Sequence, residues 1–371
     1  MSARLPASLF HWTVLAPVLS VALLGLTWGR TLPGWLVAVA SCFLAAAVLA
    51  AVHHAEVVAH RVGEPFGSLV LAVAVTVIEV ALIVTLMADG GDKSASLARD
   101  TVFAAVMITC NGIVGLCLVV GALRRGVAVF NARGTGTALA AIATLATLSL
   151  VLPTFTTSTP GPRFSGLQLV YAATASVVLY ALFVATQTVR HRSYFLPVTH
   201  EGKVIDESGA VDETHADRPS ARAALGSLGL LLLSLVGVVA LAKSVSPAVE
   251  AGVAAAGLPS AVVGVIIALL VLLPESIAAV RAARRDRVQT SLNLGFGSAM
   301  ASIGLTIPAV AAASVWLPGR LVLGLDATHI VLLVLTVAVG TLTVVPGRAV
   351  LLQGAVHLAV LAGYLVLALS P

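Results

Sequence analysis

Charged residues are scarce in this chain. Only 10% of its 371 residues are Asp, Glu, Lys or Arg, compared with about 25% in soluble proteins, and aromatic residues contribute 5%. This scarcity excludes an ordinary soluble domain. Hydrophobic residues make up 59% of the chain and its mean hydropathy is +1.06, so the composition indicates an integral membrane protein that crosses the bilayer several times.

Nucleic-acid-binding patterns, cysteine frameworks and catalytic motifs are also missing. The net charge of +5 comes from basic residues spread between apolar runs, without interleaved aromatics, so no nucleic-acid partner is expected. The three cysteines lie inside apolar runs and form no CxxC pair. The sequence has no HExxH motif, no Asp pair within a span and no nucleotide-binding loop, and no cofactor is expected.

The apolar runs predict an all-α polytopic membrane protein with eleven transmembrane helices. We expect them at about 10–28, 32–54, 67–87, 100–123, 135–152, 167–189, 223–242, 259–281, 290–316, 326–345 and 348–369. The first run has only Arg4 ahead of it and lacks a convincing small-residue cleavage site. We therefore interpret it as a retained helix and not as a signal peptide.

One substantial polar segment, 190–222, interrupts these runs. It is rich in Asp and Glu and has neither helical nor strand periodicity, which indicates a loosely ordered loop. A solvated linker is favoured, with binding of regulatory cations as the alternative. The predicted organisation is a first helix (1–31), a five-helix half (32–189), the acidic loop (190–222) and a second five-helix half (223–371).

The basic residues predict the orientation. If the N-terminus is inside, 15 of the 21 Lys and Arg residues fall in cytoplasmic segments. Only six fall outside: Arg30, Lys93, Arg99, Arg163, Lys243 and Arg320. The positive-inside rule then places the N-terminus and the acidic loop in the cytoplasm and the C-terminus outside.

Two glutamates lie well inside apolar runs. Glu79 is in GSLVLAVAVTVIEVALIVTLM and Glu275 is in the run 259–280, each in the second helix of its half. An ionised carboxylate at that depth costs about 2.5–3.5 kcal/mol on insertion scales, so it needs a cavity, a partner or an ion. Because each half has an odd number of helices, the halves would have opposite orientations. Such inverted repeats place a substrate site near the midplane, where the two acids would face each other across a pseudo-two-fold axis.

The residues around both acids resemble a known family. The stretches HAEVVAHRVGEPFGSLVLAVAVTVIEVAL and LLPESIAAVRAARRDRVQTSLNLGFGSAMASIGLTIP are similar to the calcium/cation antiporter superfamily, and more narrowly to ChaA-type bacterial sodium(potassium, calcium)/proton antiporters. The resemblance extends over nearly the whole chain. It implies a transporter of the bacterial cytoplasmic (inner) membrane whose partners are lipid, inorganic cations and protons.

The resemblance also implies roles for individual residues. Glu79 and Glu275 match the acids that bind the cation and exchange it for protons, while Asn111 and Ser298, with Ser302, would supply further oxygen ligands. Physical chemistry supports this set independently, because hard cations need oxygen ligands and a carboxylate holds either a cation or a proton. Competition for the same oxygens would enforce exchange.

The chain departs from the family pattern just before each acid. The usual Gly-Asn is replaced by Val-Thr before Glu79 and by Val-Leu before Glu275, so Thr76 still offers an oxygen whereas Leu272 does not. Calcium prefers six to eight oxygens, which makes sodium or potassium a candidate cargo beside calcium. Pro274 removes a backbone donor inside its helix, which permits a kink and frees a carbonyl one turn earlier.

A secondary metal or pH site is a further candidate. His53, Glu56 and His60 share one helical face at the cytoplasmic end of the second span, although interfacial amphipathic residues have the same pattern.

Three functions are compared on this sequence. The favoured one is a secondary antiporter that exports cytoplasmic Ca²⁺ and/or Na⁺ (K⁺) in exchange for H⁺. The alternatives are an intramembrane metal-dependent hydrolase that uses the acids as general acid and base, and a cation channel. A purely structural, protonated role for the acids is disfavoured, because two of them occupy equivalent repeat positions. Both a monomer and a homo-oligomer stay open.

Overall fold

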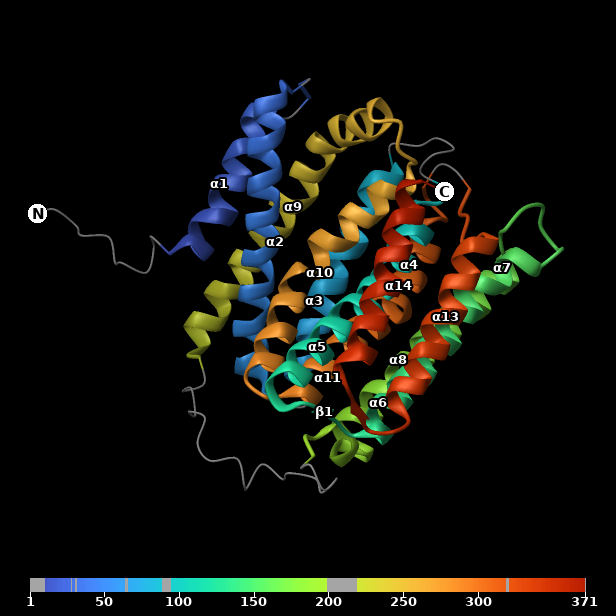
Figure 1. Ribbon diagram of the computed structural model, residues 1–371. Coiled ribbons are helices and arrows are strands. Elements are labelled where there is room, and N and C mark those ends of the chain that lie inside the picture. Colours follow the sequence, from blue (N-terminus) through green and yellow to red (C-terminus); the bar gives the residue numbers. More distant parts are fainter. Residues whose placement is uncertain are drawn as a thin grey trace, which may run out of the picture. The chain divides into compact units, whose positions relative to one another are not determined.

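The computed structural model describes residues 11–27, 29–30, 32–63, 66–88, 95–198, 219–317 and 320–370 (Figure 1). The described residues are almost entirely helical. Most of the predicted acidic loop lies outside them. The chain divides into two compact units: unit 1 comprises Met1–Asp89 and His215–Gly257, and unit 2 comprises Gly90–Thr214 and Leu258–Pro371.

Unit 1 is a bundle of four helices. They are α1 (Trp12–Thr27), α2 (Gly34–Val62), α3 (Phe66–Ala88) and α9 (Ala221–Ala255). α2 packs against the other three, and α9 also contacts α1 and α3 (Figure 1). Buried His54 of α2 bonds through Nε2 to the Thr13 carbonyl of α1 at 2.9 Å.

Unit 2 contains the remaining helices and a short pair of strands. Its segments in chain order are α4 (Leu97–Met107), the π-helical η2 (Ile108–Ile113), α5 (Val114–Arg125), β1 (Ala128–Val129), α6 (Ala132–Ala146), η3 (Thr147–Val151), α7 (Leu152–Phe155), α8 (Gly166–Ala185), η4 (Thr186–Arg190), η5 (Arg192–Phe195), α10 (Ala261–Arg284), α11 (Val288–Ala301), the π-helical η7 (Ser302–Thr306), α12 (Ile307–Ala313), α13 (Ala327–Val344), β2 (Arg348–Ala349) and α14 (Leu351–Leu369). α10 packs against α4, α5 and α11, and α14 packs against α5 and α13.

The polytopic helical prediction is confirmed. Within the described residues, nine helices are long and apolar enough to cross a membrane, and two shorter apolar helices, Trp12–Gly25 and Ala72–Ala88, lie at the first and third predicted spans. Several boundaries differ from the prediction, among them the end of α2, which lies at Val62 instead of near 54. α9 continues through Pro247 to Ala255 instead of ending near 242, and the last helix begins at Leu351 because Arg348 pairs with Val129 in a strand.

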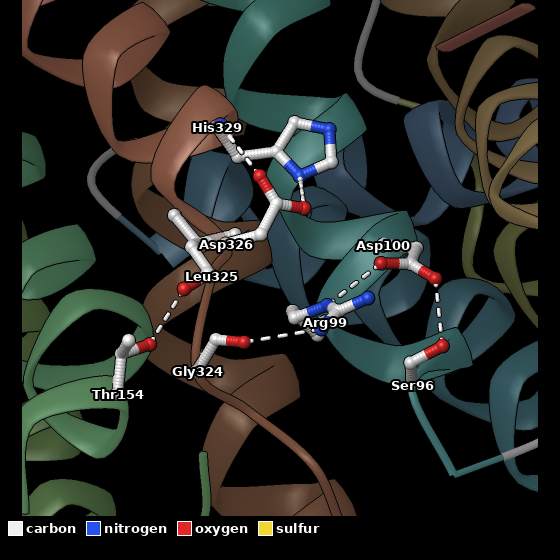
Figure 2. Close-up of polar contacts among 8 residues, drawn as sticks. All are labelled: Ser96, Arg99, Asp100, Thr154, Gly324, Leu325, Asp326 and His329. Carbon is white, nitrogen blue, oxygen red and sulfur yellow. Dashed lines mark hydrogen bonds and ion pairs between the residues drawn. The ribbon is translucent and has the colours of Figure 1, made fainter. Parts of the chain in front are cut away.

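The connections of unit 2 gather at its two ends. At one end β1 pairs antiparallel with β2, and Arg125 forms a 2.6 Å ion pair with Asp286. At the other end, shown in Figure 2, Arg99 Nη1 donates to the Gly324 carbonyl at 3.1 Å and Thr154 Oγ1 donates to the Leu325 carbonyl at 2.6 Å. Each set joins loops that the predicted alternation of spans places on the same side of the membrane.

Close helix contact in unit 2 depends on glycine. Among the glycines of its predicted site helices, Gly112, Gly115 and Gly295 have neighbours within 4 Å of the point where a Cβ would lie, whereas Gly297 has none. The backbones of α5 and α14 are in contact where Gly115 faces Gly354. Small residues at such crossings let two backbones touch, which is how helices associate in a bilayer without a hydrophobic driving force.

Replacing Gly354 with Ala should destabilise the protein. A Cβ at this position would lie 2.8 Å from the Val119 nitrogen and 2.9 Å from the Gly115 oxygen, both of which are backbone atoms. We expect the free energy of unfolding to fall by about 1–3 kcal/mol, the usual cost of overpacking. Thermal melting in detergent measures this change. Gly363→Ala in the same helix is the control, since nothing lies within 4 Å there. Equal melting temperatures for the two variants would contradict this packing.

Candidate cation and proton site

Glu79 and Thr76 lie on the buried side of α3 in unit 1. Their exposed fractions are 3% and 6%, whereas Val73 and Val77 on the same helix are 43% and 45% exposed. Thr76 Oγ1 donates to the Ala72 carbonyl at 2.9 Å, so its hydrogen is used within the helix and its lone pairs remain as acceptors. The helix therefore offers a carboxylate and a hydroxyl oxygen one turn apart on its buried face.

Glu275 lies on α10 at the level of η2 in unit 2. α10 runs parallel to α4 and α5, because Gly264 abuts the first turn of α4 while Ala279 shares a buried cluster with Ile113. Glu275 is one turn before Ala279 and is partly exposed. This register places its backbone level with the residues just before Ile113, which include Asn111.

Ser298 lies at the same level on α11. This helix runs antiparallel to α5, since Val288 meets Gly121 and Gly295 meets Ile113. Ser298 follows Gly295 by about one turn and is partly exposed, while Ser302 lies one turn farther on and is only 3% exposed. Unit 2 thus brings three of the predicted site residues, on α10, η2 and α11, to one depth.

Two of the predicted residues lie in π-helical segments. Asn111 is in η2, at the middle of the continuous helical span Leu97–Arg125, and Ser302 begins η7. π-Helical turns widen a helix, change the pairing of its carbonyls and are frequent at functional sites. In η2 the hydroxyl of Thr109 donates to the Ala105 carbonyl at 2.7 Å, a side-chain bond that bends helices. Sequence reasoning predicted neither π-helical turn.

Asn111 lies at the centre of a buried hydrogen-bond network. Its side chain is fully buried and its Nδ2 donates to Thr336 Oγ1 of α13 at 2.9 Å. Its Oδ1 lies 3.2 Å from Nδ1 of His357 in α14, and His357 Nε2 lies 3.2 Å from Thr343 Oγ1. Sequence reasoning missed these partners. The available signal was His357 itself, a lone ionisable residue inside the last apolar run.

His53, Glu56 and His60, the candidate secondary metal or pH site, lie together on α2. No group of three or more His, Cys, Asp or Glu side chains within the described ranges is placed to hold a metal ion, and His53, Glu56 and His60 do not form one. All three lie on α2, with Glu56 and His60 exposed. An interfacial location explains this polarity, because such residues reach toward water from a helix end.

Pro274 lies inside α10, which continues through it to Arg284. Proline cannot donate to the carbonyl four residues earlier, which here belongs to Leu270. Unit 2 thus combines a carboxylate, a carboxamide, a hydroxyl and proline- or π-altered carbonyls within a few turns. These are the oxygen ligands that hard cations such as Ca²⁺ and the alkali ions take, and the carboxylate also takes a proton.

Comparisons with known proteins find matches over most of the chain. The sequence pattern of the family described as sodium/calcium exchanger protein matches residues 32–189 and 226–370. The protein y4hA of Sinorhizobium fredii is 46% identical over the full length of both chains. The sodium-potassium/proton antiporter ChaA of Escherichia coli is 35% identical, over 95% of this chain and 94% of that one.

Solved structures show the same fold. Native YfkE superposes with a TM-score of 0.69 at 18% identity, over 96% of this chain and 98% of that one. The H⁺/Ca²⁺ exchanger CAX gives a TM-score of 0.64 at 14% identity, over 96% and 91% of the two chains.

Removing the Asn111 side chain should lower stability. Asn111→Ala leaves Thr336 and His357 each without one buried hydrogen-bond partner. We expect the free energy of unfolding to fall by about 1–3 kcal/mol. Thermal melting in detergent measures the loss. Ser176→Ala is the control, because it breaks a single buried contact with Ser149 of 3.3 Å. If the melting temperature of Asn111→Ala is no lower than that of this control, the hydrogen bonds of Asn111 do not stabilise the protein.

Proposed function

The chain belongs to the sodium/calcium exchanger protein family, and on that premise we propose that it exports cytoplasmic Ca²⁺, Na⁺ or K⁺ in exchange for H⁺ by alternating access. The chain is therefore a secondary transporter and not an enzyme, so the hydrolase alternative is wrong. An exchanger binds and releases its cargo, which also disfavours a channel with continuous flux. The observation that carries the proposal is the shared depth of Glu275, Asn111 and Ser298 in unit 2.

The mechanism follows from the cost of a carboxylate in the membrane. Glu79 and Glu275 must be neutralised before their helices change access, because an ionised carboxylate inside the bilayer is expensive. A proton or a cation does this equally, but the two compete for the same oxygens. Each acid therefore releases one when it binds the other, and this competition couples export of the cation to entry of the proton.

The cargo follows from the number of oxygen ligands. Leu272 supplies no side-chain oxygen one turn before Glu275, whereas Thr76 supplies one before Glu79. A site with fewer side-chain ligands suits Na⁺ or K⁺, and carbonyls freed by Pro274 and the π-helical turns would complete a calcium shell. The names of the relatives support both, since ChaA is a sodium-potassium/proton antiporter and CAX an H⁺/Ca²⁺ exchanger.

We further propose the 1+5+5 arrangement with two inverted repeats in the bacterial inner membrane. The two stretches that match the family pattern, 32–189 and 226–370, support it because they correspond closely to the two proposed halves. The partners of this arrangement are the surrounding lipid, inorganic cations and protons. The N-terminus and the 190–222 loop are cytoplasmic and the C-terminus is outside, according to the distribution of Lys and Arg.

Cysteine labelling tests the orientation. Ser158 and Ser193 are exposed in connections at opposite ends of unit 2. In a Cys42→Ala background, a membrane-impermeant maleimide should label Ser158→Cys in intact spheroplasts and Ser193→Cys only after permeabilisation, because the positive-inside rule puts Ser193 in the cytoplasm. The reverse pattern would show that the orientation is inverted.

Transport assays test the exchange. In proteoliposomes or inverted vesicles carrying a pH gradient, calcium, sodium or potassium should collapse the gradient with wild-type protein. Glu79→Gln and Glu275→Gln should each abolish this flux. Glutamine cannot take up and release a proton, and it offers the cation no negative charge. Glu250→Gln is the matched control, since Glu250 is exposed on α9 and bonded to Ser246 at 2.8 Å. The active cation identifies the cargo.

The same assay can refute the proposal. If wild-type protein shows no cation-dependent proton flux, exchange is not its function. If Glu79→Gln and Glu275→Gln keep the same flux as Glu250→Gln, the two acids are structural.

A further inference from the structure

We propose that His357 positions the carboxamide of Asn111 so that its oxygen, and not its amino group, is presented to the transported cation. The inference rests on the proposed role of Asn111 as a ligand and adds a residue that determines cation affinity and selectivity. His357 is 1% exposed in the middle of α14 and would not itself bind the cation.

The orientation of the carboxamide follows first from Thr336. A hydroxyl has one hydrogen to donate, and Thr336 Oγ1 donates it to the Leu332 carbonyl at 2.8 Å. Toward Asn111, at 2.9 Å, the same oxygen acts only as an acceptor. The group of Asn111 that faces Thr336 must therefore be its NH₂, which leaves the carbonyl oxygen on the other side.

His357 bonds to the carbonyl oxygen of the Asn111 carboxamide. Its Nδ1 lies 3.2 Å from Asn111 Oδ1, and an amide oxygen only accepts, so Nδ1 carries the hydrogen of this bond. In the neutral ring Nε2 is then an acceptor, matched by the Thr343 hydroxyl at 3.2 Å. A one-way series of bonds thus runs from Thr343 through His357 and Asn111 to Thr336 and ends at the Leu332 carbonyl.

The surroundings keep His357 in place. A Cβ on Gly115 would lie 2.9 Å from the His357 Cβ, so α5 and α14 are in contact at this residue. A cavity of about 10 Å³, at the lower limit for one water, adjoins the histidine and is lined largely by apolar side chains such as Val114, Leu118 and Phe296. The other polar neighbours of the ring are the Thr343 hydroxyl and the backbone of Cys110, the residue before Asn111 in η2.

A fixed amide oxygen matters more for calcium than for sodium. The oxygen of Asn111 has a second lone pair beyond the one directed at His357, and in this proposal that pair binds the cation. Calcium needs six to eight oxygens, and the chain already lacks a side-chain ligand at Leu272. Losing the fixed orientation of Asn111 should therefore weaken calcium binding more than sodium binding.

The test compares variants of the purified full-length protein. Cation-induced thermal stabilisation, titrated with CaCl₂ and with NaCl, gives an apparent Kd, and the proteoliposome assay gives KM and the maximal rate. His357→Leu removes the donor, whereas His357→Asn keeps an NH₂ at the position of Nδ1. Thr336→Val removes the hydroxyl that accepts from the Asn111 NH₂ group, and valine has nearly the same size as threonine. Ser176→Ala is the control for losing a buried polar contact elsewhere in unit 2.

The expected signature separates orientation from stability. His357→Leu and Thr336→Val should raise the Kd and KM for calcium about tenfold, the factor associated with one hydrogen bond, with a smaller rise for sodium. His357→Asn and Ser176→Ala should stay near wild type. The inference is overturned if His357→Leu and His357→Asn give the same Kd and KM, or if the affinities for calcium and sodium fall equally.

Binding and transport together distinguish the two claims. If wild-type protein binds calcium and the variants shift its Kd as expected, but no proton exchange occurs, the positioning role stands and the proposed exchange fails. If exchange occurs and the variants leave Kd and KM unchanged, the exchange stands and the positioning role fails. Wild-type protein that shows neither binding nor exchange refutes both.

Discussion

The structure depends on the cost of placing a carboxylate in a bilayer. Glu79 and Glu275 are tolerated in apolar spans only if a proton, a cation or a fixed dipole compensates their charge. Proton and cation are interchangeable in this role but exclude each other. In a family of exchangers, this physical constraint accounts for coupling without any chemical step, and it explains why the chain needs no catalytic motif.

Packing in unit 2 brings the proposed oxygen ligands to one level. Glycine contacts set the register of α10 and α11 against the helical span Leu97–Arg125, so that Glu275, Asn111 and Ser298 share a depth. The π-helical η2 and η7 change the carbonyl pairing of the helices that carry Asn111 and Ser302. The series of hydrogen bonds from Thr343 to Thr336 then gives the Asn111 carboxamide a single orientation. Backbone register and side-chain direction are thus determined by separate interactions.

Much of the fold could be predicted from hydropathy, because spans of about 20 apolar residues are recognisable one at a time. The predicted runs fall on helices, and the resemblance to ChaA-type antiporters is confirmed by the family match. The π-helical turns, the β1–β2 pair and the partners of Asn111 were not predictable in this way. They depend on residues far apart in sequence: Arg348 pairs with Val129, and His357 contacts Asn111. His53, Glu56 and His60 share a helical face without forming a metal-binding group, because a shared face does not by itself make three side chains converge.

The central claim is that proton and cation compete for the same two carboxylates, those of Glu79 and Glu275. Its most direct test is the number of protons released when CaCl₂ or NaCl is added to purified protein in weakly buffered detergent solution, measured alongside cation binding by calorimetry. Competition predicts proton release that saturates together with cation binding and shrinks as the pH rises and the acids lose their protons beforehand. Saturable cation binding with no proton release at any pH would contradict the account.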